Sequence, residues 1–323
     1  MQSSQQQIIS HVSQWLQQGK SLWLCTILRT WGSSPRPIGS MMACTTDGEL
    51  VGSISGGCIE EDFLKQLKTG SLKDQYAEEN APFIIMYGVT SEEQARLKLP
   101  CGGQLHVLVE YFEPLPRVVG VFNLISQALM QHKKISRVVN MSTGRIHFTE
   151  ESTNNPIEMV ESQLIHSLSP HYSLLLLGAG DVARYVAELA IAMEYNVTLC
   201  DPRPDYLRNW NVPGVETTSR LPDDVVRERF NNPYSGIIAL AHDPRVDDMA
   251  LMEALKTKAF YVGAMGSDRT SAARRERLPE LGLSPEEIAR LHAPIGFNIN
   301  SKTPAEIAIA IMAEVTAVRH KVK

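Results

Sequence analysis

The chain has 323 residues and a formal net charge of −5, with 43 % hydrophobic and 21 % charged residues. At roughly 150 residues per domain this length predicts two domains, and the composition is that of a folded protein rather than a disordered one. A net negative charge gives no general attraction to nucleic acid or anionic lipid, so we expect neither as a partner.

Targeting segments and cysteine usage indicate the compartment. Residues 1–7 have neither the basic nor the apolar region of a secretion signal, and the longest apolar runs, 174–177 and 307–313, are far shorter than the roughly 20 residues of a membrane span. The 5 cysteines are scattered and contain no CxxC pair, which indicates neither a disulfide framework nor a structural zinc site. We therefore expect a cytoplasmic protein with reduced thiols.

The first region, residues 1–150, has the pattern of a mixed α+β domain. Apolar residues recur at helical spacing over 5–18 and predict a helix, and a buried strand follows over 21–29. Residues 39–55 predict a hairpin whose turn, Thr46-Asp47-Gly48, contains the Asp-Gly pair that tight turns favour. A short helix, a strand and a helix–strand pair are expected to complete this domain at 59–67, 104–111 and 117–144.

Residues 151–170 are predicted to be a linker, polar and turn-rich at its start and with a short helix near 157–168. From residue 171 to 323 strands alternate with helices, which predicts a Rossmann-like doubly wound parallel sheet that binds its ligands at the carboxyl ends of the strands. The expected strands are 173–177, 196–200, 236–241, 260–262 and 292–294. The expected helices are 181–195, 246–255, 267–277, 285–290 and 304–319.

The first strand and helix of this second domain flank a GxGxxA sequence. Gly178 permits the tight turn and Gly180 lets the backbone approach a pyrophosphate. Asp201 ends the next predicted strand, where an acidic residue can bind ribose hydroxyls, whereas Arg203 favours a 2′-phosphate instead. These residues predict bound NAD or NADP; the alternative is an inherited fold that no longer holds a dinucleotide.

Polar residues follow two further predicted strands. His242 and Asp243 follow one, and Ser267 follows another, so we expect them to face one crevice as ligand or acid–base groups. The alternative is ordinary loop and cap chemistry, with Ser267 capping its helix. In the first case the chain would be an NAD(P)-dependent oxidoreductase with His242 as its acid–base group.

Two segments pair a thiol with two glycines. Cys58 follows Gly56 and Gly57 at the start of a predicted helix, and Cys101 precedes Gly102 and Gly103 before a predicted strand. We expect the amides of the first glycine pair to point outward and bind an anion, and the helix dipole to favour the thiolate. The alternative is a structural role for both thiols.

The remaining cysteines and one arginine complete this interpretation. Cys25, Cys44 and Cys200 lie in apolar strand contexts and are predicted to be packing residues. Arg36 ends the polar turn that follows Trp31 and can bind a phosphate group. Together these features predict a site for an anionic ligand that also needs sulfur chemistry.

Several motifs in order resemble the XdhC/CoxI family of accessory proteins for xanthine dehydrogenase and related molybdenum hydroxylases. They are Gly-Ser-Ser-Pro-Arg at 32–36, Ser-Gly-Gly-Cys-Ile-Glu at 55–60, Pro-Cys-Gly-Gly at 100–103, the Rossmann glycines, and the segments at 295–299 and 303–308. The resemblance implies a protein that binds the molybdenum cofactor in its molybdopterin form. It further implies that the protein assists sulfuration of the cofactor with a cysteine desulfurase and inserts it into the hydroxylase apoenzyme.

Carried onto this sequence, the resemblance implies that Cys58 and Cys101 contact the molybdenum, and that the neighbouring glycines shape the pocket. Soft sulfur ligands suit this metal, and backbone amides or Arg36 suit the phosphate of the cofactor. Asn298 departs from the acidic-glycine form of the family in the final loop, so an Asp-dependent role is not expected there. We expect a homodimer by default. The chaperone is the preferred function and the NAD(P)-dependent oxidoreductase the alternative.

Overall fold

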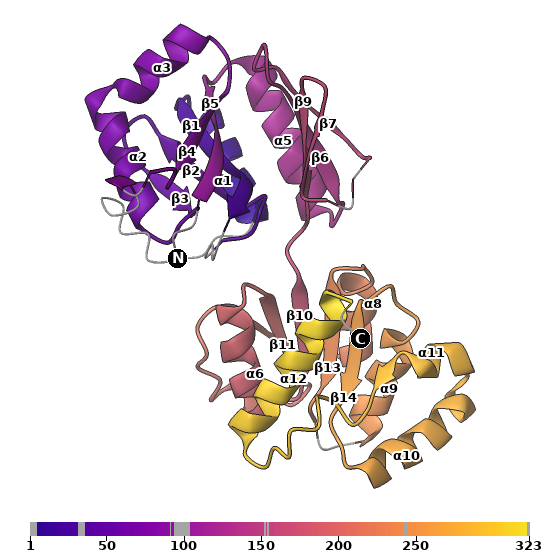
Figure 1. Ribbon diagram of the computed structural model, residues 1–323. Coiled ribbons are helices and arrows are strands. Elements are labelled where there is room, and N and C mark those ends of the chain that lie inside the picture. The colour runs from indigo at the N-terminus through magenta and orange to yellow at the C-terminus, as the bar shows by residue number, and fades with distance from the viewer. Residues whose placement is uncertain are drawn as a thin grey trace. The chain divides into compact units, whose positions relative to one another are not determined.

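The computed structural model describes residues 5–31, 36–90, 92–93, 104–151, 153, 155–241 and 244–321, without the side chains of Cys58 and residues 244–246. The chain divides into two compact units, Met1–Pro170 and His171–Lys323 (Figure 1). Within the described ranges, none of the helices combines the length and the apolar character that a bilayer span requires.

The first unit is a mixed α+β domain with two antiparallel sheets. Its helices are α1 (Gln5–Gln17), α2 (Cys58–Thr69), α3 (Ser71–Glu79) and α5 (Pro116–Met130). The strands of the larger sheet are β1 (Leu22–Trp31), β2 (Met41–Thr45), β3 (Leu50–Gly52), β4 (Phe83–Tyr87) and β5 (Gln104–Phe112), in the order β3-β2-β1-β5-β4. The smaller sheet contains β6 (Ile135–Asn140), β7 (Ile146–Thr149), β8 (Ile157–Val160) and β9 (Gln163–Leu168), in the order β7-β6-β9-β8.

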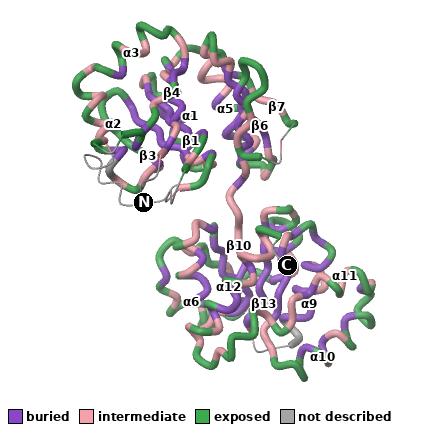
Figure 2. Tube along the Cα trace, in the orientation of Figure 1, coloured by how far each residue is buried: buried purple, intermediate pink, exposed green. Residues whose placement is uncertain are grey.

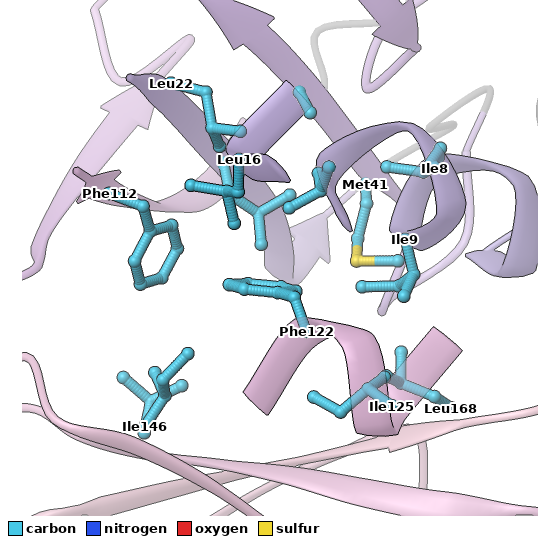
Figure 3. Packing of buried hydrophobic residues seen from close by; sticks show 14 of the residues in the cluster. Ile8, Ile9, Leu16, Leu22, Met41, Phe112, Phe122, Ile125, Ile146 and Leu168 are labelled. Carbon is cyan, nitrogen blue, oxygen red and sulfur yellow. The ribbon is translucent and has the colours of Figure 1, made fainter. Parts of the chain in front are cut away.

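Both faces of the larger sheet are packed. On one face α1 and α5 lie against each other, and the smaller sheet covers α5 from its other side. Phe122 of α5 is fully buried in this layer (Figure 3). Its ring and that of Phe112 are arranged edge to face, with 5.1 Å between the ring centroids. On the opposite face α2 covers a second apolar cluster that includes Phe63 and Cys25. Strand β5 supplies alternate residues to the two clusters, as its predicted alternation requires.

The segment 151–170 differs from the predicted linker and helix. Residues 157–160 and 163–168 form the antiparallel hairpin β8–β9, and β9 pairs with β6 along its whole length. Leu164 and Leu168 are four residues apart, which places them on one face of a helix and equally on one face of a strand. Pairing with β6, which lies far from them in the sequence, decides for the strand. The described stretch up to Leu168 therefore belongs to the first unit.

The second unit has a six-stranded, all-parallel sheet, which confirms the predicted fold class. Its strands are β10 (Ser173–Leu177), β11 (Asn196–Cys200), β12 (Val215–Thr218), β13 (Ser235–Ala239), β14 (Tyr261–Ala264) and β15 (Leu291–His292). The order β12-β11-β10-β13-β14-β15 is that of the doubly wound dinucleotide-binding fold, with its switch point between β10 and β13.

Helices cover both faces of this sheet. They are α6 (Asp181–Ala192), α7 (Pro204–Leu207), α8 (Pro222–Arg229), α9 (Pro244–Ala254), α10 (Asp268–Arg277), α11 (Pro285–Ala289) and α12 (Pro304–Arg319), with a 3-10 turn at Leu278–Leu281. Helices α6 and α12 pack on one face, and α8 and α9 pack on the other. The strands in the middle of each unit are accordingly buried, and the outer faces of the helices are exposed (Figure 2). A capping box formed by Thr303 and Glu306 begins α12.

Candidate functional site

Several of the predicted site residues lie outside the described residues. They are Cys101, Gly102, Gly103, His242 and Asp243, together with the side chain of Cys58. The expectation that Cys58 and Cys101 both contact the molybdenum therefore stays a prediction. The backbone at Cys58, the loop before it, Arg36 and the Rossmann glycines are described.

Strands of the larger sheet precede or follow each of the three motif segments of the first unit. Strand β1 ends at Trp31, before the Arg36 turn, and β5 begins at Gln104, after the Cys101 motif. Trp31 and Gln104 are opposite each other in the antiparallel β1–β5 register. Strand β3 is parallel to β1, because both pair antiparallel with β2, and it ends at Gly52, before the loop that leads to Cys58. β1 and β3 therefore run in the same direction, but Gly52 is level with Met42 and so with Cys25, which precedes Trp31 on β1.

Residues 53–57 form a loop between β3 and α2 that surrounds the carboxylate of Glu60, a buried residue with 7 % exposure. Glu60 Oε1 accepts hydrogen bonds from the hydroxyl of Ser53 at 2.7 Å and from the N–H groups of Ile54, Ser55 and Gly56 at 2.8, 2.9 and 3.3 Å. Glu60 Oε2 accepts from the N–H group of Gly57 at 2.9 Å and from the hydroxyl of Ser55. One carboxylate thus satisfies six donors of a single loop.

Glu60 is ionised in this setting. Burial opposes its charge, but the hydrogen bonds from Ser55, Ser53 and the backbone outweigh burial and lower the pKa of Glu60 to about 2. The carboxylate occupies the amides of Gly56 and Gly57, which the sequence predicts to face outward and bind an external anion. That prediction is wrong for these two amides, because an acid of the chain itself fills the anion-binding arrangement.

The loop needs glycine at positions 56 and 57 because of its backbone conformation, and not because a side chain there would clash with its neighbours. Gly56 and Gly57 have φ values of +91° and +149°, a region that residues with a Cβ rarely adopt. A Cβ at either position would meet nothing within 4 Å. The outer side of the loop that precedes Cys58 is therefore open, and a role of these glycines in shaping a pocket remains a prediction.

The three cysteines predicted to be packing residues are buried. Cys25 and Cys44 lie in the core of the first unit and Cys200 in that of the second. Burial raises the pKa of Cys44 and of Cys200 to about 11 and that of Cys25 well above its usual value. A buried thiol that resists ionisation is a poor nucleophile and a poor metal ligand. The candidates for sulfur chemistry are therefore Cys58 and Cys101.

Gly178 has the role that the fingerprint predicts. It follows β10 with φ +98°, and a Cβ at this position would lie 2.8 Å from the Cα and N atoms of Ala241, which follows β13. Two adjacent strands thus meet closely at the switch point of the sheet, where only glycine fits. Gly180, by contrast, has φ −102° and open space where its Cβ would be.

This contrast gives a matched pair of substitutions. Gly178→Ala is expected to destabilise the second unit by about 1–2 kcal/mol, because the side chain meets backbone atoms in a left-handed conformation. Gly180→Ala should change stability little. Hydrogen–deuterium exchange of peptides from β10 and β13 measures the difference, and equal protection in the two variants would contradict the assigned contact.

Asp201, predicted to bind ribose, is fully buried and bound within the protein. Its Oδ2 accepts from the N–H group of Ala179 at 2.9 Å and from Arg203 Nη2 at 2.8 Å, and its Oδ1 accepts from the backbone N–H and Nε of Arg203 at 3.0 and 2.9 Å. Burial opposes the charge, but Arg203 and the Ala179 amide lower the pKa of Asp201. The half-exposed Arg203 guanidinium also lies over the Tyr206 ring, 3.7 Å from its centroid. Arg203, rather than Asp201, is presented to solvent.

Family models match both units of the chain. The model of the XdhC and CoxI family matches residues 15–75, and the model of the XdhC Rossmann domain matches residues 174–315. The chain belongs to the XdhC and CoxI family. The resemblance expected from the Cys58 and Cys101 motifs is thereby confirmed.

Relatives of this family match the chain over nearly its whole length. The molybdenum cofactor insertion chaperone PaoD of Escherichia coli K12 is 26 % identical over 313 residues, which cover 94 % of this chain and 85 % of PaoD. A protein of Bacillus subtilis 168 described as a probable xanthine dehydrogenase subunit is 24 % identical over 323 residues, with 93 % of each chain covered. A crystal structure described as a xanthine dehydrogenase from Bacillus halodurans has the same fold, with a TM-score of 0.72 and 23 % identity over 98 % of this chain and 96 % of that one.

Proposed function

We propose that this protein is a maturation factor for a molybdenum enzyme. It binds the molybdenum cofactor in its molybdopterin form, assists sulfuration of the cofactor with a cysteine desulfurase, and inserts it into xanthine dehydrogenase or a related hydroxylase. The similarity to a molybdenum cofactor insertion chaperone over 94 % of the chain supports the maturation role. The proposed partners are the apoenzyme, the desulfurase and a second copy of this chain, and the proposed location is the cytoplasm.

The observation that supports this proposal is the pairing of β1 and β5, the two strands that flank the Arg36 turn and the Cys101 motif. Trp31 and Gln104 are paired residues that adjoin this turn and this motif, and β3, which leads to Cys58, runs parallel to β1. When bound there, the cofactor would supply the molybdenum and a phosphate group. Cys58 and Cys101 would provide sulfur ligands to the metal, as its chemistry favours. Arg36, which is half-buried, would bind the phosphate, because the loop amides are already occupied by Glu60.

The test measures the pterin that remains with freshly purified protein, by fluorescence after oxidation. Cys58→Ser and Cys101→Ser are each expected to weaken binding by about tenfold or more, since each removes a sulfur ligand. Cys200→Ser is the matched control, because its thiol is buried in the second unit and donates to the Arg220 carbonyl, as a serine hydroxyl also can. Equal pterin content in all three variants would remove both thiols from the site.

The alternative function, that of an NAD(P)-dependent oxidoreductase, requires the Rossmann unit to bind a dinucleotide. The close turn at Gly178 and the strand order favour a nucleotide at the switch point. Because Asp201 is buried and paired with Arg203, the group exposed at the carboxyl end of β11 is the Arg203 guanidinium. A cation at this position favours the 2′-phosphate of NADP over the free ribose hydroxyl of NAD. Equilibrium dialysis against both dinucleotides should detect NADP preferentially, and no binding of either at millimolar concentration would exclude this alternative.

A further inference from the structure

We propose that Glu60 is the positioning residue of the cofactor site, a built-in anion that holds loop 53–57 in one conformation and thereby sets the position of Cys58. This inference rests on the proposed function of Cys58. It gives a role to Glu60, the last residue of the motif at 55–60, to which the family resemblance assigns none.

The loop depends on this carboxylate for its hydrogen bonds. Ile54 is fully buried, and its N–H group donates to Glu60 Oε1 at 2.8 Å. Without that acceptor the amide would be left in the interior without a partner, which is unfavourable. Gly56 and Gly57 have no side chains to hold the loop in place, and adjacent glycines have wide conformational freedom. The six charge-assisted contacts to Glu60 therefore select the observed conformation.

The same carboxylate is connected to the chain on both sides of Cys58. The residue before it, Gly57, donates its N–H group directly to Glu60 Oε2 at 2.9 Å. The residue after it, Ile59, donates its N–H group to the Ser55 hydroxyl at 3.1 Å, and that hydroxyl donates to Glu60 Oε2. Cys58 is the first residue of α2 between these two contacts. Its backbone position is thus set by hydrogen bonds that meet at one carboxylate.

An ordinary capping box does not account for this arrangement. The described residues of the second unit include two such boxes for comparison. Glu287 accepts one backbone N–H group, that of Ser284, and Glu306 accepts those of Lys302 and Thr303. Glu60 accepts four backbone N–H groups and two hydroxyls, and it uses both oxygens. It organises a whole loop rather than the end of a helix alone.

Three variants test the proposal, each made in the full chain with the substitution Cys101→Ser. In this background Cys58 remains, and the other thiols, those of Cys25, Cys44 and Cys200, are buried. Glu60→Gln replaces one acceptor oxygen by a donor group, Glu60→Ala empties the loop, and Glu61→Gln changes the adjacent, exposed acid as a control. The first two should speed amide exchange of the glycines at 56 and 57 by about tenfold or more. They should also change the rate at which Cys58 reacts with a disulfide reagent.

Acetate distinguishes positioning from a general loss of folding. Added to Glu60→Ala, it is expected to refill the empty loop and restore both amide protection and the Cys58 rate, whereas an unfolded variant would not respond. Unchanged exchange and thiol rates in Glu60→Gln would overturn the proposal. If the loop responds as expected but Cys58→Ser retains full pterin binding, the proposed function fails and Glu60 keeps only its effect on the loop.

Discussion

Replacing Arg137 by methionine is expected to destabilise the first unit by about 3–5 kcal/mol. Arg137 of β6 and Glu110 of β5 are 0 % and 1 % exposed, and Nη1 of the arginine lies 2.8 and 2.6 Å from the two oxygens of the glutamate. Arg137 Nη2 also donates to the Thr26 hydroxyl at 3.3 Å. Burial raises the pKa of Glu110, and the charge of Arg137 counteracts that rise. Without Arg137 the acid is left unpaired in the core between two sheets.

Urea unfolding measures this effect. Trp210 is the tryptophan of the second unit, so a Trp210→Phe background confines the fluorescence signal to Trp15, Trp23 and Trp31 in the first. The double variant Arg137→Met/Glu110→Met is the control, because replacing a buried pair by apolar side chains is often close to neutral. It should recover most of the stability that the single variant loses. A loss below about 1 kcal/mol in the single variant would mean that the pair is not buried as described.

Part of this ion pair could be read from the sequence. Arg137 has the same strand parity as Ile135 and Val139, and Glu110 the same as Leu108 and Phe112, so each charge lies on a strand face that also carries buried apolar residues. Their partnership could not be predicted, because each strand belongs to a different sheet and no local pattern records which sheets pack together. The same limit explains β9, whose identity as a strand depends on pairing with a distant strand.

The second unit was predicted more completely because its pattern is local. Each long strand and its helix are adjacent in the sequence, and their order alone determines a parallel sheet. The sequence pattern does not predict β12, α7 or α8. The first two have four residues each, too few to show a period, and the eight residues of α8 contain only two buried valines, Val225 and Val226. At the candidate site the sequence predicts the glycine positions of the loop before Cys58. It does not predict that the carboxylate of Glu60 accepts hydrogen bonds from the amides of Gly56 and Gly57. Only the position of Glu60, three residues after Gly57, was open to a capping-box argument.

A histidine beside the buried ion pair should make the first unit sensitive to acid. His166 of β9 is fully buried, and its Nε2 lies 3.1 Å from the Gly39 carbonyl oxygen, to which it donates as a neutral ring. Burial and the charge of Arg137 lower the pKa of His166 to about 3. An unfolded chain takes up this proton near pH 6.5, whereas the native state resists it. The unfolded state therefore binds more protons between about pH 6.5 and 3, and stability falls as the pH falls through that window.

Measured in urea at pH 7 and pH 5, His166→Gln is expected to lose less stability on acidification than the parent protein, by about 2 kcal/mol. His147→Gln is the control, because His147 is an exposed histidine of the same unit, on β7. Identical pH profiles for the two variants would contradict the neutral, buried state of His166. Because Arg137 contributes to the low pKa, Arg137→Met should raise the pKa of His166 and flatten the profile. The ion pair and the acid sensitivity are thus coupled through one guanidinium, and a variant that removes it alters both.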